Sequence, residues 1–301
     1  MGLITSHPQF RLMKKTIDSI STDDLSKFQV CIGAGKLVTK EKMEDGYVED
    51  MEIAGTTLLV EKPQGQPMAT DDITLGGSVR YLPKTMAKKV SITEEAMEDG
   101  KYKEAIQASK RLTASAYRTE DADFASVIIN STSTAGGYDQ LTLANSAHKL
   151  PNGSTTSNLL TTYSSPSLAA LILAKAQLGL MPGPNGLVQP LQAKLIVCPL
   201  IQEDVWKTLL GSEKVTGSNF NDINIVKSYG LKVLPIYHLD GASTTQWGLK
   251  TDADEGFKLY YKRSITGTSW VDNDATVMHY GVSYRNAQGW SNWRCWFQGQ
   301  V

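Results

Sequence analysis

Residues Cys31 to Lys36 read CIGAGK, which is the stretch of this chain that comes nearest to a phosphate-binding loop. A P-loop needs a glycine five residues before its Gly-Lys pair and a serine or threonine directly after it. Val30 and Leu37 occupy these two positions, so the pattern fails. The dinucleotide fingerprint fails as well, because Val38 stands where its third glycine belongs. The sequence therefore predicts a glycine-containing turn here and no nucleotide cofactor.

The other residue combinations that do covalent or metal chemistry are also missing. The sequence has no Gly-x-Ser-x-Gly, no Cys-x-x-Cys and no His-Glu-x-x-His, and its four histidines do not fall at metal-ligand spacing. Glu203 and Asp204 are adjacent acids, but they stand where a short helix is expected to begin, and acids at that position normally cap the helix. We expect no enzyme activity, no metal and no cofactor. An unfamiliar enzyme that uses such scattered acids stays open as an alternative.

Charge and composition narrow the class of protein further. The 301 residues include 30 Lys and Arg and 31 Asp and Glu, for a formal net charge of −1, which gives no basic surplus for sequence-specific DNA binding. Three widely spaced cysteines fit a reducing compartment and no disulfide framework. The longest apolar run, Leu168 to Ala174, is too short to span a membrane, and the N-terminus does not resemble a signal peptide. We expect a soluble protein that is made in a cytoplasm.

The N-terminal third of the chain has two parts. Residues 1–45 are polar with weak periodicity and are expected to form an arm without a core of its own. Residues 46–93 hold two strand-like stretches on either side of a turn-rich segment, which predicts a long hairpin. Each arm of about 14 residues would reach about 45 Å. A ribbon of that length cannot bury itself, so it either needs a partner chain or folds onto a sheet of its own subunit.

The strongest helical signal lies between residues 94 and 132, and the long helix itself is expected from about 100 to 132. Apolar and small residues recur there at the spacing of an amphipathic helix, and Thr93 with two following glutamates can cap its start. We expect buried side chains at Ile106, Leu112, Phe124, Val127 and Ile128, and exposed ones at Lys103, Lys110 and Arg118. A helix of this length in a chain of this size acts as a spine.

The rest of the chain alternates between short elements. A polar loop at 138–165 precedes a helix at 168–179 that Ser167 can cap, and then come a strand at 193–200 and a short helix at 201–210. Strands are predicted near 223–228, 231–239 and 244–250, and again from 257 to the end, where four of the six tryptophans lie. This alternation is typical of an α/β or α+β unit around one core.

The order of these parts resembles that of the major capsid proteins of tailed bacteriophages, which share the Hong Kong 97 fold. The segment Ile92-Thr93-Glu94-Glu95, followed by Glu98 and Asp99, is similar to the junction between hairpin and spine helix in many of them. The loop at 145–160, NSAHKLPNGSTTSNLL, resembles the loop after the spine in Mu-like relatives. The resemblance covers the whole chain in order of parts.

This resemblance implies an α+β capsid fold with five parts. They are an N-terminal arm at 1–45, an extended hairpin called the E-loop at 46–93, a peripheral domain at 94–165, an axial domain at 166–249, and returning strands of the peripheral domain at 250–301. It also implies a structural shell subunit that assembles into the icosahedral head around the phage genome, without enzyme activity. An encapsulin-like shell of a bacterial compartment is the alternative.

The resemblance also implies partners and contacts. The subunit would bind copies of itself in pentamers and hexamers, and it would bind scaffolding, portal and cement proteins. It would contact packaged double-stranded DNA without sequence preference, and it would not bind membranes. It would be assembled in the host bacterial cytoplasm and reside in the virion. Some relatives link a hairpin lysine covalently to a neighbour, and Lys62 and Lys84 are lysines of the predicted hairpin. Lysines at exposed hairpin positions are also common because they keep the strand edge soluble and protected. The residues predicted at contacts between subunits are Leu58, Val60, Lys62, Val79, Leu82, Lys84, Trp290 and Trp293.

Overall fold

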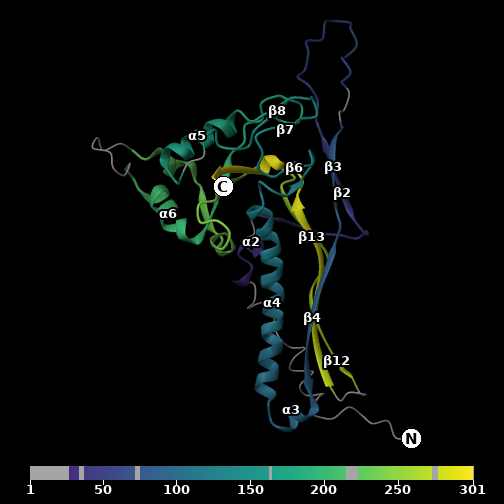
Figure 1. The fold of residues 1–301 in the computed structure, drawn as a ribbon. Helices are drawn as coiled ribbons and strands as arrows, with labels where there is room; N and C mark the ends of the chain where they lie inside the picture. The colour runs from purple at the N-terminus through teal and green to yellow at the C-terminus, as the bar shows by residue number, and fades with distance from the viewer. Residues whose placement is uncertain are drawn as a thin grey trace.

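The computed structural model describes residues 27–33, 37–71, 75–162, 165–214, 223–272 and 277–300. One long helix, α4 (Tyr102–Ile129), runs beside a long, narrow sheet, and a second unit with its own sheet lies to one side of their upper end (Figure 1). A thin ribbon projects past that end (Figure 1). The fold is therefore an elongated body with an extension that has few neighbours within its own chain.

The sheet beside α4 has the strand order β1-β12-β13-β4, and we call it the peripheral sheet. Its main strands, β12 (Phe257–Asp272) and β13 (Val277–Trp290), form a long antiparallel pair. β4 (Lys84–Thr93) is antiparallel to β13, and β1 (Thr39–Lys42) is parallel to the start of β12. Side chains of β13 alternate between half-buried and buried over its first eight residues, as expected for a sheet with one face covered by a helix.

α4 packs on this sheet through the stripe that the sequence predicted. Leu112, Phe124 and Ile128 are buried, Ile106 and Val127 are half-buried, and Lys103, Lys110 and Arg118 are exposed. The short helix α3 (Glu94–Glu98) precedes α4, and the Thr93 hydroxyl accepts a hydrogen bond from Ala96 N at 3.4 Å. At about 1.5 Å per residue the 28-residue helix is about 42 Å long, so it lies along most of the sheet.

The second unit is built on a sheet with the order β10-β9-β11-β14, which we call the axial sheet. Its strands are β9 (Ala193–Cys198), β10 (Lys232–Pro235), β11 (Trp247–Thr251) and β14 (Trp296–Gln300). Helices α5 (Leu168–Gly179), α6 (Glu203–Gly211) and α7 (Tyr237–Asp240) belong to this unit, with 3-10 turns at Leu200–Gln202, Ile225–Tyr229 and Trp293–Cys295. Ser167 caps α5, as predicted, by accepting from Ala170 N at 3.2 Å.

Short pairs of strands join these units. β5 (Ala135–Gly136) pairs with β6 (Leu141–Thr142), and β7 (His148–Lys149) pairs with β8 (Thr155–Thr156). Within the loop that carries them, His148 is fully buried, stacks on Trp293 at 4.0 Å between ring centroids, and contacts Asp139 at 2.6 Å. The polar loop expected at 138–165 is therefore an ordered connector between the two sheets.

The predicted hairpin differs from the observed one. β2 (Val48–Ile53) pairs with β3 (Leu75–Tyr81), but the chain then leaves this pairing and β4 joins β13 in the peripheral sheet. The prediction that residues 79–93 form one continuous hairpin arm is wrong. Pro83 stands at the break, where its fixed φ and missing N–H disfavour a continuous strand.

Three further expectations need correction. Residues in the second half of the predicted arm, including Cys31, Ile32 and Leu37, are buried in the main core; residues 1–26 lie outside the described residues. The predicted strand at 223–228 is instead a 3-10 turn over Ile225–Tyr229. The returning strands at 250–301 are divided between sheets, because β14 pairs with β11 in the axial sheet.

Candidate assembly surface

Among the residues that the structure describes, the most exposed stretch is the loop between β2 and β3. We call β2, β3 and the intervening residues 54–71 the ribbon. Within it, residues 55–71 are all exposed, and Leu58, Leu59, Val60 and Met68 are 72%, 101%, 68% and 80% accessible. Figure 1 shows that this loop extends beyond the rest of the molecule. Several large apolar side chains that lie together in contact with water are typical of a surface that another protein covers.

The base of the ribbon is held to the body by a carboxylate on β2. Asp50 accepts hydrogen bonds from Lys258 Nζ at 2.8 Å, from Ser291 Oγ at 2.6 Å and from the Tyr260 hydroxyl at 3.1 Å. Burial alone would lower the pKa of Lys258, but its hydrogen bonds to Asp50 and Glu255 outweigh burial and raise that pKa. Lys258 therefore stays charged, and the ionic contact fixes β2 against β12.

A second carboxylate on β2 forms a buried ion pair. Glu52 Oε1 lies 3.0 Å from Arg294 Nη1, and the two side chains are 8% and 1% accessible. Arg294 also donates from Nε to the Pro182 carbonyl at 2.9 Å and stacks on Trp293 at 4.4 Å. Burial lowers the pKa of Arg294, and the charge of Glu52 opposes that shift. Glu52 is therefore the counter-charge of an arginine in the interior.

Close backbone packing holds the other strand of the ribbon. A Cβ on Gly77 would lie 1.8 Å from the Tyr138 carbonyl oxygen, so β3 approaches the 138–142 loop more closely than any side chain allows. At the root of the loop, Asp71 accepts from Thr57 N and Oγ1 at 2.6 and 2.8 Å, and Asn185 donates to the Thr56 carbonyl at 2.9 Å. The ribbon thus has a fixed root and an apolar stretch that its own subunit leaves uncovered.

The structure divides the predicted contact residues into two groups. Leu58, Val60, Lys62, Leu82 and Lys84 are exposed and available to another chain. Val79 is half-buried against the small core cluster around Tyr81 and Tyr260.

Trp290 and Trp293 are 6% and 1% accessible within the subunit, where they pack in its own cores. This burial agrees with a place in the core, which aromatic residues of this kind take as often as an interface, and their contact with a neighbouring subunit stays a prediction.

An exposed tryptophan that the sequence did not single out lies elsewhere. Trp270 on β12 is 42% accessible and lies across Gly281, where a Cβ would come within 2.9 Å of its ring. Lys89 Nζ is 5.8 Å from the centre of the ring, and His279 lies beside it at 5.3 Å between centroids. The one signal for this flat platform in the sequence was Gly281, which lies two residues beyond His279, the partner of Trp270 on the adjacent strand.

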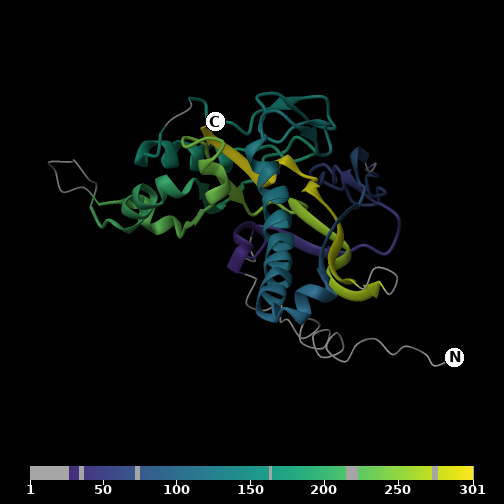
Figure 2. The ribbon, with the colours of Figure 1, turned by 60° about the horizontal axis from the view of Figure 1, so that its bottom comes forward.

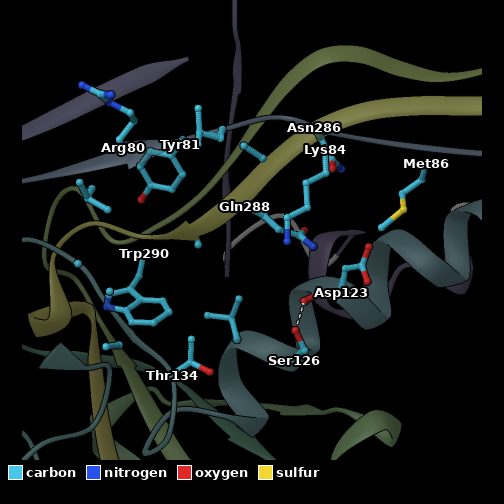
Figure 3. A pocket seen from close by; sticks show the side chains of 18 residues that line it. Arg80, Tyr81, Lys84, Met86, Asp123, Ser126, Thr134, Asn286, Gln288 and Trp290 are labelled. Carbon is cyan, nitrogen blue, oxygen red and sulfur yellow. Dashed lines mark hydrogen bonds between the residues drawn. The ribbon is translucent and has the colours of Figure 1, made fainter. Parts of the chain in front are cut away.

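A groove separates α4 from the start of β4, as Figure 3 shows. Its volume is about 360 Å³, and it is lined by side chains of both polar and apolar character, among them Leu82, Lys84, Met86, Asp123 and Trp290. Burial raises the pKa of Asp123, and its hydrogen bond from Tyr284 and the charge of Lys84 partly offset this rise. The groove is open to a partner, and Asp123 is the one carboxylic acid among the residues that line it, which is a poor basis for catalysis.

The described residues include one group with the composition of a cysteine catalytic site. Asp121 Oδ1 accepts from Cys31 N at 2.9 Å and from Ile32 N at 3.1 Å, and His238 Nε2 is 3.4 Å from Asp121 Oδ2. However, Cys31 is fully buried and burial raises its pKa, so the thiol is protonated and not nucleophilic. Asp121 instead ties α2 (Val30–Gly33) to α4.

Within the parts of the chain that the structure describes, no three His, Cys, Asp or Glu side chains are arranged to hold a metal ion. Among the described ranges, no helix combines the length and apolar composition needed to span a bilayer.

A comparison with models of protein families gives one match that decides the class. Residues 77–298, well over half of the chain, match the model described as phage capsid protein. The chain belongs to this family. The match favours a phage shell over the encapsulin-like alternative, and a search of curated proteins found no match.

Solved capsid structures have the same fold. The capsid of the cyanophage P-SCSP1u aligns with a TM-score of 0.58 at 10% identity, covering 87% of this chain and 85% of that one. The capsid of a native GTA particle aligns at 0.56 with 10% identity and 91% of both chains, and that of the Myoviridae phage XM1 at 0.52 with 14% identity, 87% and 88%. The predicted Hong Kong 97 type fold is confirmed, and the chain is a shell subunit and virion component.

Proposed function

We propose that this major capsid protein closes the phage head by laying its ribbon on a neighbouring copy. The observation that carries the proposal is the uncovered apolar stretch Leu58 to Val60 on a loop whose root is fixed by Asp50 and Glu52. A fixed root limits the positions that the loop samples, and this lowers the entropy lost when it binds. Burial of three such side chains contributes about 1.5–3 kcal/mol each.

The receiving surface in this proposal is the face of the peripheral sheet that α4 does not cover. That face presents the half-exposed ring of Trp270 with the exposed cations Lys89, Arg263 and Arg285. The loop offers aliphatic side chains together with the exposed acid Glu61. An aromatic anchor beside cations complements a partner that is aliphatic and acidic.

The same proposal includes the oligomers that the subunit forms, the place of assembly and the partners of the shell. Copies would form pentamers and hexamers in the host bacterial cytoplasm, with scaffolding, portal and cement proteins as partners and double-stranded DNA inside. We infer no enzyme activity, and the support is the burial of Cys31 and the single perturbed carboxyl in the groove. The proposed parts keep the order expected from the sequence, which is arm, ribbon, peripheral domain, axial domain and returning strands, with the ribbon ending at Tyr81 and β14 belonging to the axial sheet.

The test replaces Leu58, Leu59 and Val60 together by serine. The matched control replaces them by methionine, methionine and isoleucine, which keep the apolar surface. The serine variant is expected to remain folded with an unchanged melting temperature and to lose closed shells in negative-stain electron microscopy, while the control assembles. Normal shells from the serine variant would contradict the proposal, and so would loss of the subunit fold.

A further inference from the structure

One lysine and two carboxylates meet where the ribbon joins the body of the subunit. Lys258 Nζ on β12 lies 2.8 Å from Asp50 Oδ2 on β2, and it also contacts the carboxylate of Glu255. The side chains of Lys258 and Asp50 are 7% and 13% accessible, so this pair is largely shielded from water. The two residues are 208 positions apart in the sequence. Figure 2 shows the ribbon beside the strands of the peripheral sheet.

The surroundings of Asp50 hold its carboxyl group in one orientation. The Ser291 hydroxyl donates to Asp50 Oδ2 at 2.6 Å, and the Tyr260 hydroxyl donates to Oδ1 at 3.1 Å. The Tyr81 hydroxyl lies 2.7 Å from Ser291 Oγ and completes a chain of hydroxyl groups that ends at this carboxyl. Fixed donors of this kind also stabilise the negative charge that develops on a carboxyl oxygen when a nucleophile adds to the carbon.

The backbone at Glu255 has an unfavourable conformation. Its φ is +56°, in the left-handed region that residues with a Cβ seldom adopt. Two main-chain hydrogen bonds hold this turn, from Asn292 N to the Glu255 carbonyl at 2.8 Å and from Ser291 N to the Gly256 carbonyl at 3.2 Å. The Glu255 side chain is 55% accessible while it contacts the buried Lys258 ammonium. Strain of this kind is concentrated at functional sites, and this carboxylate is placed to accept a proton from Lys258.

We propose that Lys258 and Asp50 join in an amide bond within the subunit, with Glu255 as the proton acceptor. The starting state is the ion pair. Glu255 takes a proton from the Lys258 ammonium, and the nitrogen then adds to Cγ of Asp50. The two protons that leave the nitrogen pass through Glu255 to one oxygen of Asp50, whose bond to Cγ breaks. That oxygen departs as water, so one ammonium and one carboxylate become one amide and one water molecule.

The bond forms once in each chain, so it is not enzyme turnover. A groove of about 960 Å³, lined among others by Asp50, Glu255 and Lys258, gives the released water a way out. The amide would fix β2 to β12 permanently, whereas an ion pair at this site can open. Because both residues belong to one chain, the bond joins no two subunits and adds no band above the monomer mass. It is therefore distinct from a link through the exposed hairpin lysines Lys62 and Lys84.

The test is intact-mass spectrometry of the purified full chain, followed by peptide mapping. The unmodified chain is expected to be lighter than its sequence by one water molecule and to give one branched peptide that joins Asp50 to Lys258. Lys258→Arg should have the full mass, because a guanidinium does not lose its proton in proteins. Asp50→Asn should lose one ammonia molecule in place of water. Glu255→Gln, which cannot accept the proton, should leave most chains unlinked.

The matched control is Lys262→Arg. Lys262 also lies on β12, but its Nζ donates to the main-chain carbonyls of Glu44 and Asp45. This variant should lose one water molecule, as the unmodified chain does. A full sequence mass in the unmodified chain after prolonged incubation in the folded state would overturn the inference. A loss of water that persists in Lys258→Arg, or a Glu255→Gln chain that links as fast as the unmodified one, would overturn it too. The unmodified chain alone decides the matter if a variant fails to fold.

Discussion

The buried ion pair at the base of the ribbon gives a prediction with a calculable size. Glu52→Gln removes the counter-charge of Arg294, which is 1% accessible and cannot reach water without opening the core. Loss of one partner of a buried pair costs about 3–5 kcal/mol, a large share of the stability of a typical domain. The free energy of unfolding of the unassembled subunit, from urea titration, should fall by that amount.

The same strand supplies a matched control. Glu49 on β2 pairs with Arg80 on β3 at 3.1 Å, but their side chains are 37% and 55% accessible. Water screens this pair, so Glu49→Gln should cost no more than about 1 kcal/mol. Because the charge is the cause, the double change Glu52→Leu with Arg294→Met should recover most of the loss. Equal costs for the two single variants would refute the reasoning, and so would a double variant that is no more stable than Glu52→Gln.

Further predictions test other parts of the structure. Leu112→Ala should cost about 2–5 kcal/mol in urea unfolding and reduce soluble yield; a loss below 1 kcal/mol would mean that α4 packs by another face. Trp270→Ala should impair shell formation with an unchanged melting temperature, whereas Trp293→Ala should lower stability by about 3–5 kcal/mol; identical behaviour would remove the distinction between platform and core. Gly77→Ala should destabilise the ribbon base, seen as faster proteolysis within residues 54–71, because its Cβ would overlap a backbone oxygen. A boiled, reduced particle should run as one band near the monomer mass; a ladder of higher bands that disappears in Lys62→Arg would instead reveal covalent linkage.

The helices α4 and α5 could be predicted from the sequence because their signals are local. The stripe through Leu112, Phe124 and Ile128 has helical spacing, and Ser167 stands directly before an apolar run, so α4 and α5 follow from periodicity and capping. The exposure of Leu58 and Val60 was also predictable, because a ribbon of that kind cannot cover itself.

The errors arose where long-range pairing overrides local preference. The residues on both sides of Pro83 have strand character, and competition between two partners decides that β3 pairs with β2 and β4 with β13. Trp290 and Trp293 have the composition of an interface, yet the two sheets meet at these residues and bury them. The acids of β2 look like solvent-exposed charges until the fold brings Lys258 and Arg294 beside them. Such partners lie more than 200 positions away in the sequence.

The exposed cations of α4 (Lys103, Lys110, Arg111 and Arg118) form a basic row that the sequence analysis missed for a different reason. The total charge was used as evidence, and opposite charges on separate surfaces cancel in a sum. The helical pattern already placed Lys103, Lys110 and Arg118 on the exposed side, so the row was available in the sequence. What only the structure adds is that Glu120 and Asp121 are buried and engaged elsewhere.

The central claim, that this chain closes into a shell through its ribbon, is tested most directly by cryo-electron microscopy of the purified chain after concentration. The account predicts closed particles or capsomer rings in which density for residues 54–71 of one subunit lies on the peripheral sheet of the next, beside Trp270. A monodisperse monomer at all concentrations, or a closed shell whose ribbons contact no neighbouring subunit, would contradict it.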